Sequence, residues 1–253
     1  MREATVVPDW PAPPRVHALT TTRTLPGNSL PPYDALNLGL RSGEDESTVL
    51  ANRALLERAF NLPSPPRWLQ QVHGDRVLRL THEVLPGEPQ ADAVFTSEPG
   101  VVLAIQTADC LPILVCAADG SEIAAIHAGW RGLAAGVIES CVHRLATPAS
   151  HLLVWLGPAI GPASYEVGEE VRAAFVERDL AADSAFTATR PGHWHCDLYA
   201  LARRRLGALG VTRIYGGGLD TLADARFYSY RRDGARSGRM ASLIWLKTTA
   251  DSA

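Results

Sequence analysis

Apolar and polar residues follow two different periods along the chain. Between residues 46 and 60, apolar side chains return every three or four positions, which predicts an amphipathic helix that ends at Asn61 and Pro63. Similar apolar patterning predicts further helices over residues 133–145, 169–177 and 198–209.

Shorter runs rich in Val, Ile, Leu and Ala predict β-strands. They cover residues 76–80, 93–96, 101–106, 112–117, 122–126, 152–156 and 239–247. Strands and helices alternate irregularly, with no internal repeat and no low-complexity tract. This order favours an α+β fold, a sandwich built around a mixed sheet.

Length and composition indicate one domain. The chain has 253 residues, of which 46% are hydrophobic, so it is long enough to bury a sizeable core. We expect residues 1–14, which are rich in proline, to form a mobile or surface-hugging lead-in, and residues 15–253 to form a single catalytic domain. Residues 24–33, "TLPGNSLPPY", are typical of a loop.

Charge and cysteine content narrow the class of partner. The net charge of -3 arises from 24 basic and 27 acidic side chains that are interspersed, so we expect a small-molecule substrate and no nucleic-acid or membrane partner. The 4 cysteines form no CxxC pair, which favours reduced thiols. There is no apolar signal segment and no run long enough to span a bilayer. We therefore expect a cytoplasmic protein, and a monomer.

Three residues with metal-binding side chains stand where apolar strands end. They are His73 in "LQQVHGDRV", Cys110 in "AIQTADCLP" and His127 in "AAIHAGWRG". They are too widely spaced for a zinc-finger loop, so only the fold can bring them together. Two imidazoles and one thiolate would give Zn²⁺ three ligands and leave a fourth position for water or substrate. The alternative is that the cysteine is merely buried and the histidines bond to backbone.

Two aspartates accompany these residues. Asp92 and Asp109 are candidates for orienting a metal ligand or for acid–base catalysis. The remaining cysteines and histidines that we considered lack such a setting and are expected to pack or to face solvent. They are Cys116, Cys141, His17, His82, His143 and His151.

Residues 129–132, "GWRG", predict a turn that leads into the helix at 133–145. Its backbone amides and Arg131 could face a phosphate or carboxylate, although Arg131 could equally pair with an acidic side chain. A second loop rich in Gly and Pro, "LGPAIGPASYEVG", presents Tyr165 and Glu166 at its tip, with a tight structural turn as the alternative. The segment "RFYSYRRDGARSGRM" interleaves aromatic residues and arginines, which could stack a base or hold phosphate, with a solvated arginine face as the alternative. Without an overall positive charge it is weak evidence for a nucleic-acid surface.

Taken together, several motifs resemble the YfiH/laccase-domain family, also called the polyphenol oxidase or peptidoglycan-editing-factor family. The motifs are "TTTR", "ALNLG", "QQVHG", "ADAVFT", "TADCLPIL", "AAIHAGWRG", "GPAIGPASYEVG", "FYSYRRDG" and "GRMASLIWL". They occur in the family's order from about residue 15 to residue 247.

The resemblance implies an α/β/β/α sandwich, similar to that of the cytotoxic-necrotizing-factor deamidases, and a zinc site at His73, Cys110 and His127. It also implies that Arg231 of "SYRR" grips phosphate or the nucleoside, and that Asn37 of "ALNLG" contacts substrate. Members are described as purine nucleoside phosphorylases that act on adenosine, inosine and methylthioadenosine and that deaminate adenosine. Others are described as copper-dependent polyphenol oxidases or as amidases that edit a peptidoglycan precursor.

The chain departs from the family pattern in two places. "TLPGNSLPPY" replaces the usual Gly-Gly-Val-Ser turn, and Leu219 and Asp220 stand where the family has a cysteine and a threonine. Both stretches could line the pocket, and a change there would affect substrate preference.

The residues also rank the possible functions. Several coppers would need many histidines in His-x-His pairs, and only His193 and His195 form one, so copper oxidase chemistry ranks below zinc. The H-x-E and P-C-x-x-C signatures of base deaminases are missing. An amidase would use Cys110 as nucleophile with His127 as its base. A non-catalytic binding module is disfavoured by the convergent polar residues. We expect a zinc-dependent purine nucleoside phosphorylase with adenosine deaminase activity.

Overall fold

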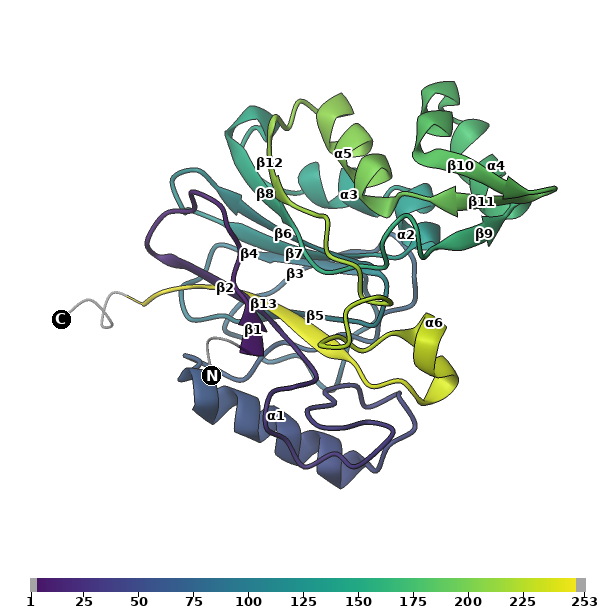
Figure 1. The fold of residues 1–253 in the computed structure, drawn as a ribbon. Helices are drawn as coiled ribbons and strands as arrows, with labels where there is room; N and C mark the ends of the chain where they lie inside the picture. The colour runs from purple at the N-terminus through teal and green to yellow at the C-terminus, as the bar shows by residue number, and fades with distance from the viewer. Residues whose placement is uncertain (1–3, 249–253) are drawn as a thin grey trace.

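Two β-sheets lie face to face in the middle of the molecule, and helices cover their outer faces (Figure 1). The computed structural model describes residues 4–248. The first sheet is antiparallel throughout. Its strands, in spatial order, are β1 (Thr5–Val6), β2 (Val16–Thr21), β13 (Met240–Leu246) and β5 (Leu103–Thr107).

The second sheet is mixed. Its two outermost pairs, β12 with β8 and β3 with β4, are parallel, and its central pairs are antiparallel. In spatial order the strands are β12 (Arg213–Gly216), β8 (Leu152–Leu156), β6 (Leu111–Ala117), β7 (Ile123–Ala128), β4 (Ala93–Thr96) and β3 (Val77–Arg79).

Helix α1 (Glu46–Phe60) packs on the outer face of the first sheet, where Leu56 joins Leu19, Ala104 and Leu243 in one apolar cluster. Three helices cover the outer face of the second sheet: α2 (Trp130–Ala135), α3 (Val137–Val142) and α5 (Leu198–Ala208). Helix α4 (Glu169–Val176) packs beside α2 and against the small third sheet described below. The expected α/β/β/α sandwich is thereby confirmed.

The space between the sheets is filled by side chains from both. Leu114 of β6 and Trp155 of β8 meet Ile105 of β5 and Ile244 of β13 there. Every residue of β6 and of β13 is buried, because each strand lies in the interior of its sheet with both faces covered. This is why their sequences are continuous apolar runs rather than alternating ones.

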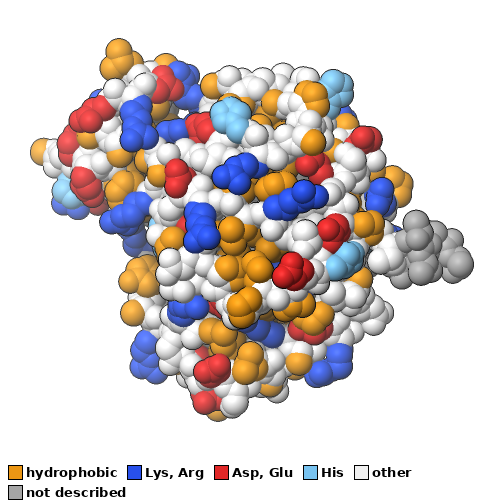
Figure 2. All heavy atoms as spheres, turned by 180° about the vertical axis from the view of Figure 1, so that it is seen from behind, with side chains coloured by type: hydrophobic (Ala, Val, Ile, Leu, Met, Phe, Trp, Pro, Cys, Tyr) orange, Lys and Arg blue, Asp and Glu red, His pale blue; other side chains and the backbone are white. Residues whose placement is uncertain are grey.

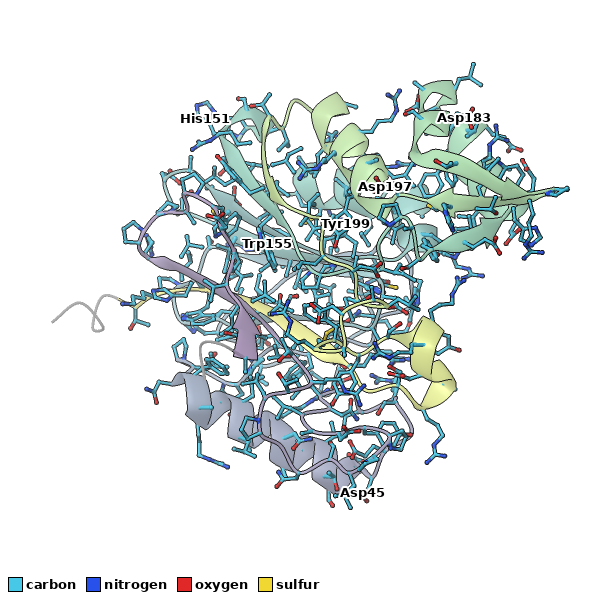
Figure 3. The ribbon with its side chains drawn as sticks, in the orientation of Figure 1. Asp45, His151, Trp155, Asp183, Asp197 and Tyr199 are labelled. Carbon is cyan, nitrogen blue, oxygen red and sulfur yellow. The ribbon has the colours of Figure 1, made fainter. Side chains whose placement is uncertain are left out.

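Local sequence explains where two of the helices begin. Asp45 precedes α1 and accepts a hydrogen bond from the Thr48 N–H, and Asp197 does the same for Ala200 at the start of α5 (Figure 3). Asn61 ends α1 in the left-handed conformation. The predicted helix bounds at 46–60 are confirmed, and those at 169–177 and 198–209 are each one residue too long.

One predicted helix is wrong in its bounds. The segment 133–145 is two short helices, α2 and α3, separated by Gly136 at φ 105°. Helix α2 already begins at Trp130, so residues 129–132 form its first turn instead of a preceding turn. The apolar pattern continued across Gly136 because both helices cover the same sheet face.

Several short strands were not predicted. A small third sheet contains β10 (Phe186–Arg190), β11 (His193–Cys196) and β9 (Glu166–Gly168). The proline-rich lead-in contributes β1, and its Trp10 and Ala12 pack against the core between the sheets. Short turns complete the described part of the chain: α6 (Tyr230–Asp233) and the 3-10 helices η2 (Ala149–His151), η3 (Leu180–Ala185) and η4 (Gly234–Arg236).

Basic and acidic side chains alternate over the face seen in Figure 2. Among residues 4–248, no helix is both long enough and apolar enough to cross a membrane.

Candidate metal centre

His73, Cys110 and His127 converge at one end of the sandwich. One ligand atom from each lies within 4.8 Å of the others. The Cys110 Sγ is 3.8 Å from the His73 Nε2, and the two imidazole rings stand nearly perpendicular, with centroids 4.8 Å apart. His73 precedes β3, Cys110 lies at the turn from β5 to β6, and His127 is on β7.

The neighbouring backbone is shaped to allow this approach. His73 has φ 61°, in the left-handed region that non-glycine residues rarely occupy. A Cβ on Gly129 would lie 2.9 Å from both the Cys110 Sγ and the His73 ring. A Cβ on Gly132 would lie 2.8 Å from the carbonyl oxygen of Gly74. The two glycines of "GWRG" therefore let the His73 loop and Cys110 pack against the start of α2.

Asp92 holds two of the three residues in place. Its buried carboxylate accepts hydrogen bonds from the backbone N–H groups of His73 (2.9 Å) and Gly74 (2.8 Å) and lies 2.8 Å from the His127 Nδ1. A carboxylate at Nδ1 directs the Nε2 of His127 toward the cluster. This arrangement supports the expectation that Asp92 orients a ligand.

Neighbouring charges and hydrogen bonds shift the pKa values of Cys110, His127 and Asp92. Burial alone would raise the pKa of Cys110, but the His127 charge and hydrogen bonds from both imidazoles lower it to about 6. Burial alone would lower the pKa of His127, but the Cys110 charge and the Asp92 hydrogen bond raise it to about 9. Burial alone would raise the pKa of Asp92, but its hydrogen bonds to His127 and to the amides of His73 and Gly74 lower that pKa overall. Near neutral pH the pair is a thiolate beside an imidazolium.

The donor set fits a transition-metal ion. Cysteine thiolates and histidine imidazoles are the usual protein ligands of such ions, and the three ligand atoms lie within 4.8 Å of one another. Zinc accepts one thiolate and two imidazoles, and three protein ligands would leave room for one further ligand.

A cavity of about 580 Å³ opens beside the cluster. Arg131, Tyr165 and Arg231, all predicted from the sequence, line it together with Asp109. Arg131 lies over the Trp130 ring, 4.3 Å from its centroid, and forms no ion pair with a carboxylate among the described residues. Arg231 donates to the Glu166 carbonyl and lies 5.3 Å from the centroid of the Tyr165 ring.

Asp109 connects the cluster to Arg231. Its carboxylate accepts hydrogen bonds from the Thr221 hydroxyl (2.6 Å), the Ser229 hydroxyl (3.0 Å) and the Arg231 N–H (2.7 Å). Its φ of 86° turns the chain sharply just before Cys110. The aspartate thus anchors two distant loops beside the cysteine.

Asn37 lies one layer behind the cavity wall and is fully buried. Its side chain bonds to the backbone of Gly39 and Arg239 and to Ser42 and Glu44. The cavity lining also includes Gln106 and Thr107, which were not predicted, and Arg239. Arg239 belongs to the segment "RFYSYRRDGARSGRM", and the sequence left open whether its arginines hold phosphate or form a solvated face.

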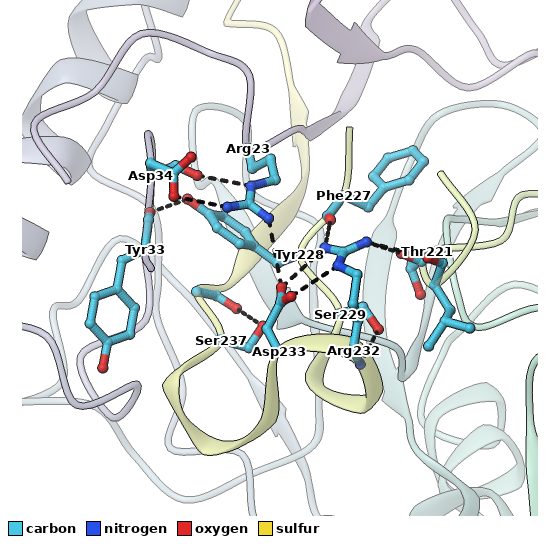
Figure 4. A network of polar contacts seen from close by, with 12 residues as sticks. Arg23, Tyr33, Asp34, Thr221, Phe227, Tyr228, Ser229, Arg232, Asp233 and Ser237 are labelled. Atoms are coloured by element: carbon cyan, nitrogen blue, oxygen red, sulfur yellow. Dashed lines mark hydrogen bonds and ion pairs between the residues drawn. The ribbon is translucent and has the colours of Figure 1, made fainter. Parts of the chain in front are cut away.

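The segment that carries Arg231 is tied down by a polar network (Figure 4). Arg23 pairs with Asp34 (3.0 Å) and Asp233 (3.6 Å), and Arg232 also pairs with Asp233 (2.9 Å). The arginines of "SYRR" therefore differ, since Arg232 is structural and Arg231 faces the cavity.

The hypothesis that both departing stretches line the pocket is wrong. Neither residues 24–33 nor Leu219 and Asp220 are part of the cavity lining. The Leu219 carbonyl accepts a hydrogen bond from the Tyr199 hydroxyl, and the Asp220 carboxylate accepts one from the Ser164 hydroxyl. Both groups are committed to contacts within the fold.

The remaining candidates are placed as expected. Cys116 and Cys141 are buried, which raises the pKa of each thiol to about 12, and His143 is exposed at the end of α3.

Comparison with known proteins agrees with this geometry. The family model described as multi-copper polyphenol oxidoreductase laccase matches residues 17–247, and the chain belongs to this family. It is 54% identical to a purine nucleoside phosphorylase of Xylella fastidiosa (strain Temecula1), with 95% of this chain and 96% of that protein covered. It is 50% identical to the purine nucleoside phosphorylase YfiH of Escherichia coli (strain K12), with 95% and 98% covered. The solved structure of a Neisseria meningitidis protein matches with TM-score 0.92 and 42% identity, over 97% of this chain and 100% of that one.

Proposed function

We propose that this enzyme is a purine nucleoside phosphorylase that uses zinc. The observation that carries the proposal is one cavity that combines a His-Cys-His cluster with arginines that lack acidic partners. In the reaction, a phosphate oxygen bonds to the ribose C1', the C1'–N9 bond breaks, and its electron pair leaves with the purine, which takes up a proton. The products are ribose 1-phosphate and the free base.

The chain's own residues have distinct parts in this proposal. His73, Cys110 and His127 would hold the ion, which when bound would supply Lewis acidity at the cavity wall. Asp92 keeps His127 in the ligating orientation, and Arg131 and Arg231 bind anionic oxygens. Tyr165, half-buried beneath Arg231, offers an apolar ring for the nucleoside.

Zinc is proposed over copper because of the number of ligand clusters. Within residues 4–248, His73, Cys110 and His127 are the only group of three or more such side chains close enough to share an ion. The His193 and His195 pair lies on β11, outside this cavity. A multicopper centre needs more histidines than this arrangement offers.

A second candidate rests on the same atoms. Cys110, His127 and Asp92 are arranged as nucleophile, base and orienting acid, and the lowered pKa of Cys110 suits a cysteine amidase. Chelation separates the two candidates, because a cysteine amidase would need no metal.

The test is an assay of purified, metal-analysed protein with inosine or adenosine, with and without phosphate. We expect about one zinc per chain, and base release that depends on phosphate and yields ribose 1-phosphate. Ammonia released from adenosine would support the deaminase activity that we also propose. Stoichiometric copper without zinc, or base release that ignores phosphate, would contradict the proposal. Elution as a single chain on size exclusion would support the proposed monomer.

Arg231 and Arg236 make a matched pair for the anion-binding assignment. Arg231→Ala should raise the KM for phosphate roughly tenfold or more, because a guanidinium facing the ligand contributes charge-assisted hydrogen bonds. Arg236→Ala should change it little, since Arg236 is exposed on η4 and does not line the cavity. Equal effects of the two changes on steady-state kinetics would count against Arg231.

A further inference from the structure

Arg239 is a half-buried arginine in the cavity wall. Its Nη1 donates to the carbonyls of Ser237 (2.6 Å) and Gly238 (2.9 Å). Its Nε and Nη2 make no hydrogen bond to any residue in the described range 4–248, and no carboxylate of that range lies within ion-pair distance. One edge of the guanidinium is therefore held by protein and the other is not.

The segment 37–39 is built to hold this side chain. The Asn37 Oδ1 accepts the N–H of Arg239 (2.8 Å) and that of Gly39 (3.0 Å), and the Leu38 N–H donates to the Arg239 carbonyl (3.2 Å). A Cβ on Gly39 would lie 2.5 Å from the Arg239 Cγ. Asn37 therefore holds the Arg239 backbone, and the missing side chain of Gly39 leaves room for the Arg239 side chain. The buried Asn37 thus contributes to the cavity by positioning Arg239.

Other arginines nearby are neutralised by acids. The exposed Arg41 lines the same cavity but pairs with Glu88 (2.5 Å), as does the buried Arg53 (2.8 Å). Arg23 pairs with Asp34 and Asp233 (Figure 4). A guanidinium withdrawn from water without an acidic partner is costly unless an anion compensates it. Arg239 is half-buried and makes no such ion pair among the described residues, and only the more distant charges of Cys110 and Asp109 offset part of its burial.

We infer that Arg239 binds inorganic phosphate through its free Nε and Nη2 edge, as a phosphate ligand in addition to Arg231. This inference rests on the proposed phosphorylase function, because phosphate is the co-substrate there. A planar guanidinium presents two parallel N–H donors that match two phosphate oxygens. Its half-burial strengthens the interaction by excluding water, whereas Arg231 is exposed.

The experiment compares Arg239→Gln, Arg239→Lys and Gly39→Ala with the control Arg236→Gln, all in the zinc-loaded enzyme. We expect Arg239→Gln to raise the KM for phosphate by roughly 10- to 100-fold and to leave the KM for inosine within about threefold. Arg239→Lys should recover part of the lost phosphate affinity, since lysine keeps the positive charge but lacks the two parallel N–H donors of the guanidinium. Gly39→Ala should reproduce the phosphate defect without removing any charge, because the new Cβ displaces the Arg239 side chain. Gly39 is not among the glycines with positive φ, so the backbone tolerates alanine.

A second measurement does not depend on turnover. Inorganic phosphate should raise the Tm of the wild-type and Arg236→Gln proteins and should lose most of that effect in Arg239→Gln and Gly39→Ala. An unchanged phosphate KM and an unchanged phosphate-induced shift in both variants would overturn the inference. So would a loss of zinc in Arg239→Gln at unchanged phosphate KM, which would mean that Arg239 only balances the Cys110 thiolate. Wild-type protein that cleaves inosine without regard to phosphate would refute the proposed function instead, and the thermal shift would still decide the role of Arg239.

Discussion

At the scale of single residues, each member of the metal cluster is held by a neighbour with a defined task. Asp92 fixes His127 and the His73 loop, and the missing side chain of Gly129 makes room for Cys110. His127 is the last residue but one of the buried strand β7, and there the Asp92 carboxylate reaches its Nδ1. Substitutions at the cluster should therefore change metal binding before they change the fold.

Cys110→Ser separates a metal ligand from a nucleophile. If Cys110 binds zinc, bound metal and activity should fall together, since a serine hydroxyl stays protonated near neutral pH and is a far weaker ligand than a thiolate. Metal analysis and the phosphorolysis assay measure both effects. His143→Ala is the control, because His143 is exposed at the end of α3 and should affect neither. Full activity after chelation, with rapid inactivation by an alkylating reagent, would identify a nucleophile instead.

The pH dependence of the metal-free protein follows from the pKa shifts. The pKa of Cys110 is lowered to about 6, so its thiolate is present above that pH and is lost below it. The alkylation rate should therefore rise through about pH 6 instead of the usual 8.5 or so. The pKa of His127 is raised to about 9, so zinc must displace its proton below that pH. Zinc affinity should rise about tenfold per pH unit between 6 and 9, and more steeply below 6.

Buried cysteines provide the internal control for that titration. Burial raises the pKa of Cys116 and Cys141 to about 12, so both should resist alkylation across the same range. Mass spectrometry of the alkylated protein would locate the modified residue. Modification of Cys116 at a rate equal to that of Cys110 would contradict the assignment.

At the scale of elements, glycine separates α2 from α3. Gly136 has φ 105°, so Gly136→Ala should lower the free energy of unfolding by about 1–2 kcal/mol, since alanine is strained in that conformation. Gly207→Ala is the matched control within α5, where nothing lies within 4 Å of the added Cβ, and it should raise stability by about 0.5–1 kcal/mol. Urea unfolding of both variants measures the difference. A stabilising Gly136→Ala would mean that the two helices are one.

At the scale of the whole molecule, stability rests on the layer between the two sheets. Leu114→Ala should cost about 2–5 kcal/mol, because Leu114 is fully buried there and its removal leaves a cavity. Leu50→Ala on α1 should change stability by less than about 0.5 kcal/mol, since Leu50 is 48% exposed. Chemical denaturation of both variants provides the comparison. Similar costs at the two positions would argue that the interface between the sheets is not the main core.

The sequence by itself determined those features that depend on neighbouring residues. Helix α1 and strands β4 and β8 have the predicted bounds. Each was predicted from its own residues, because the helix has an amphipathic period and each strand is a continuous apolar run. The order of the motifs indicated the family, and the ligand types His, Cys and His indicated a metal site.

Tertiary structure alone decided which polar residues face the cavity and which support it. Strands β9, β10 and β11 are short and, for β10, largely exposed, so their pairing depends on partners distant in sequence. Asn37 and Arg239 come from opposite ends of the chain, and only their contact shows that one holds the other at the cavity wall. The packing of the two sheets sets the distances between segments that are remote in sequence. Local residue patterns therefore cannot predict which remote side chains will be in contact.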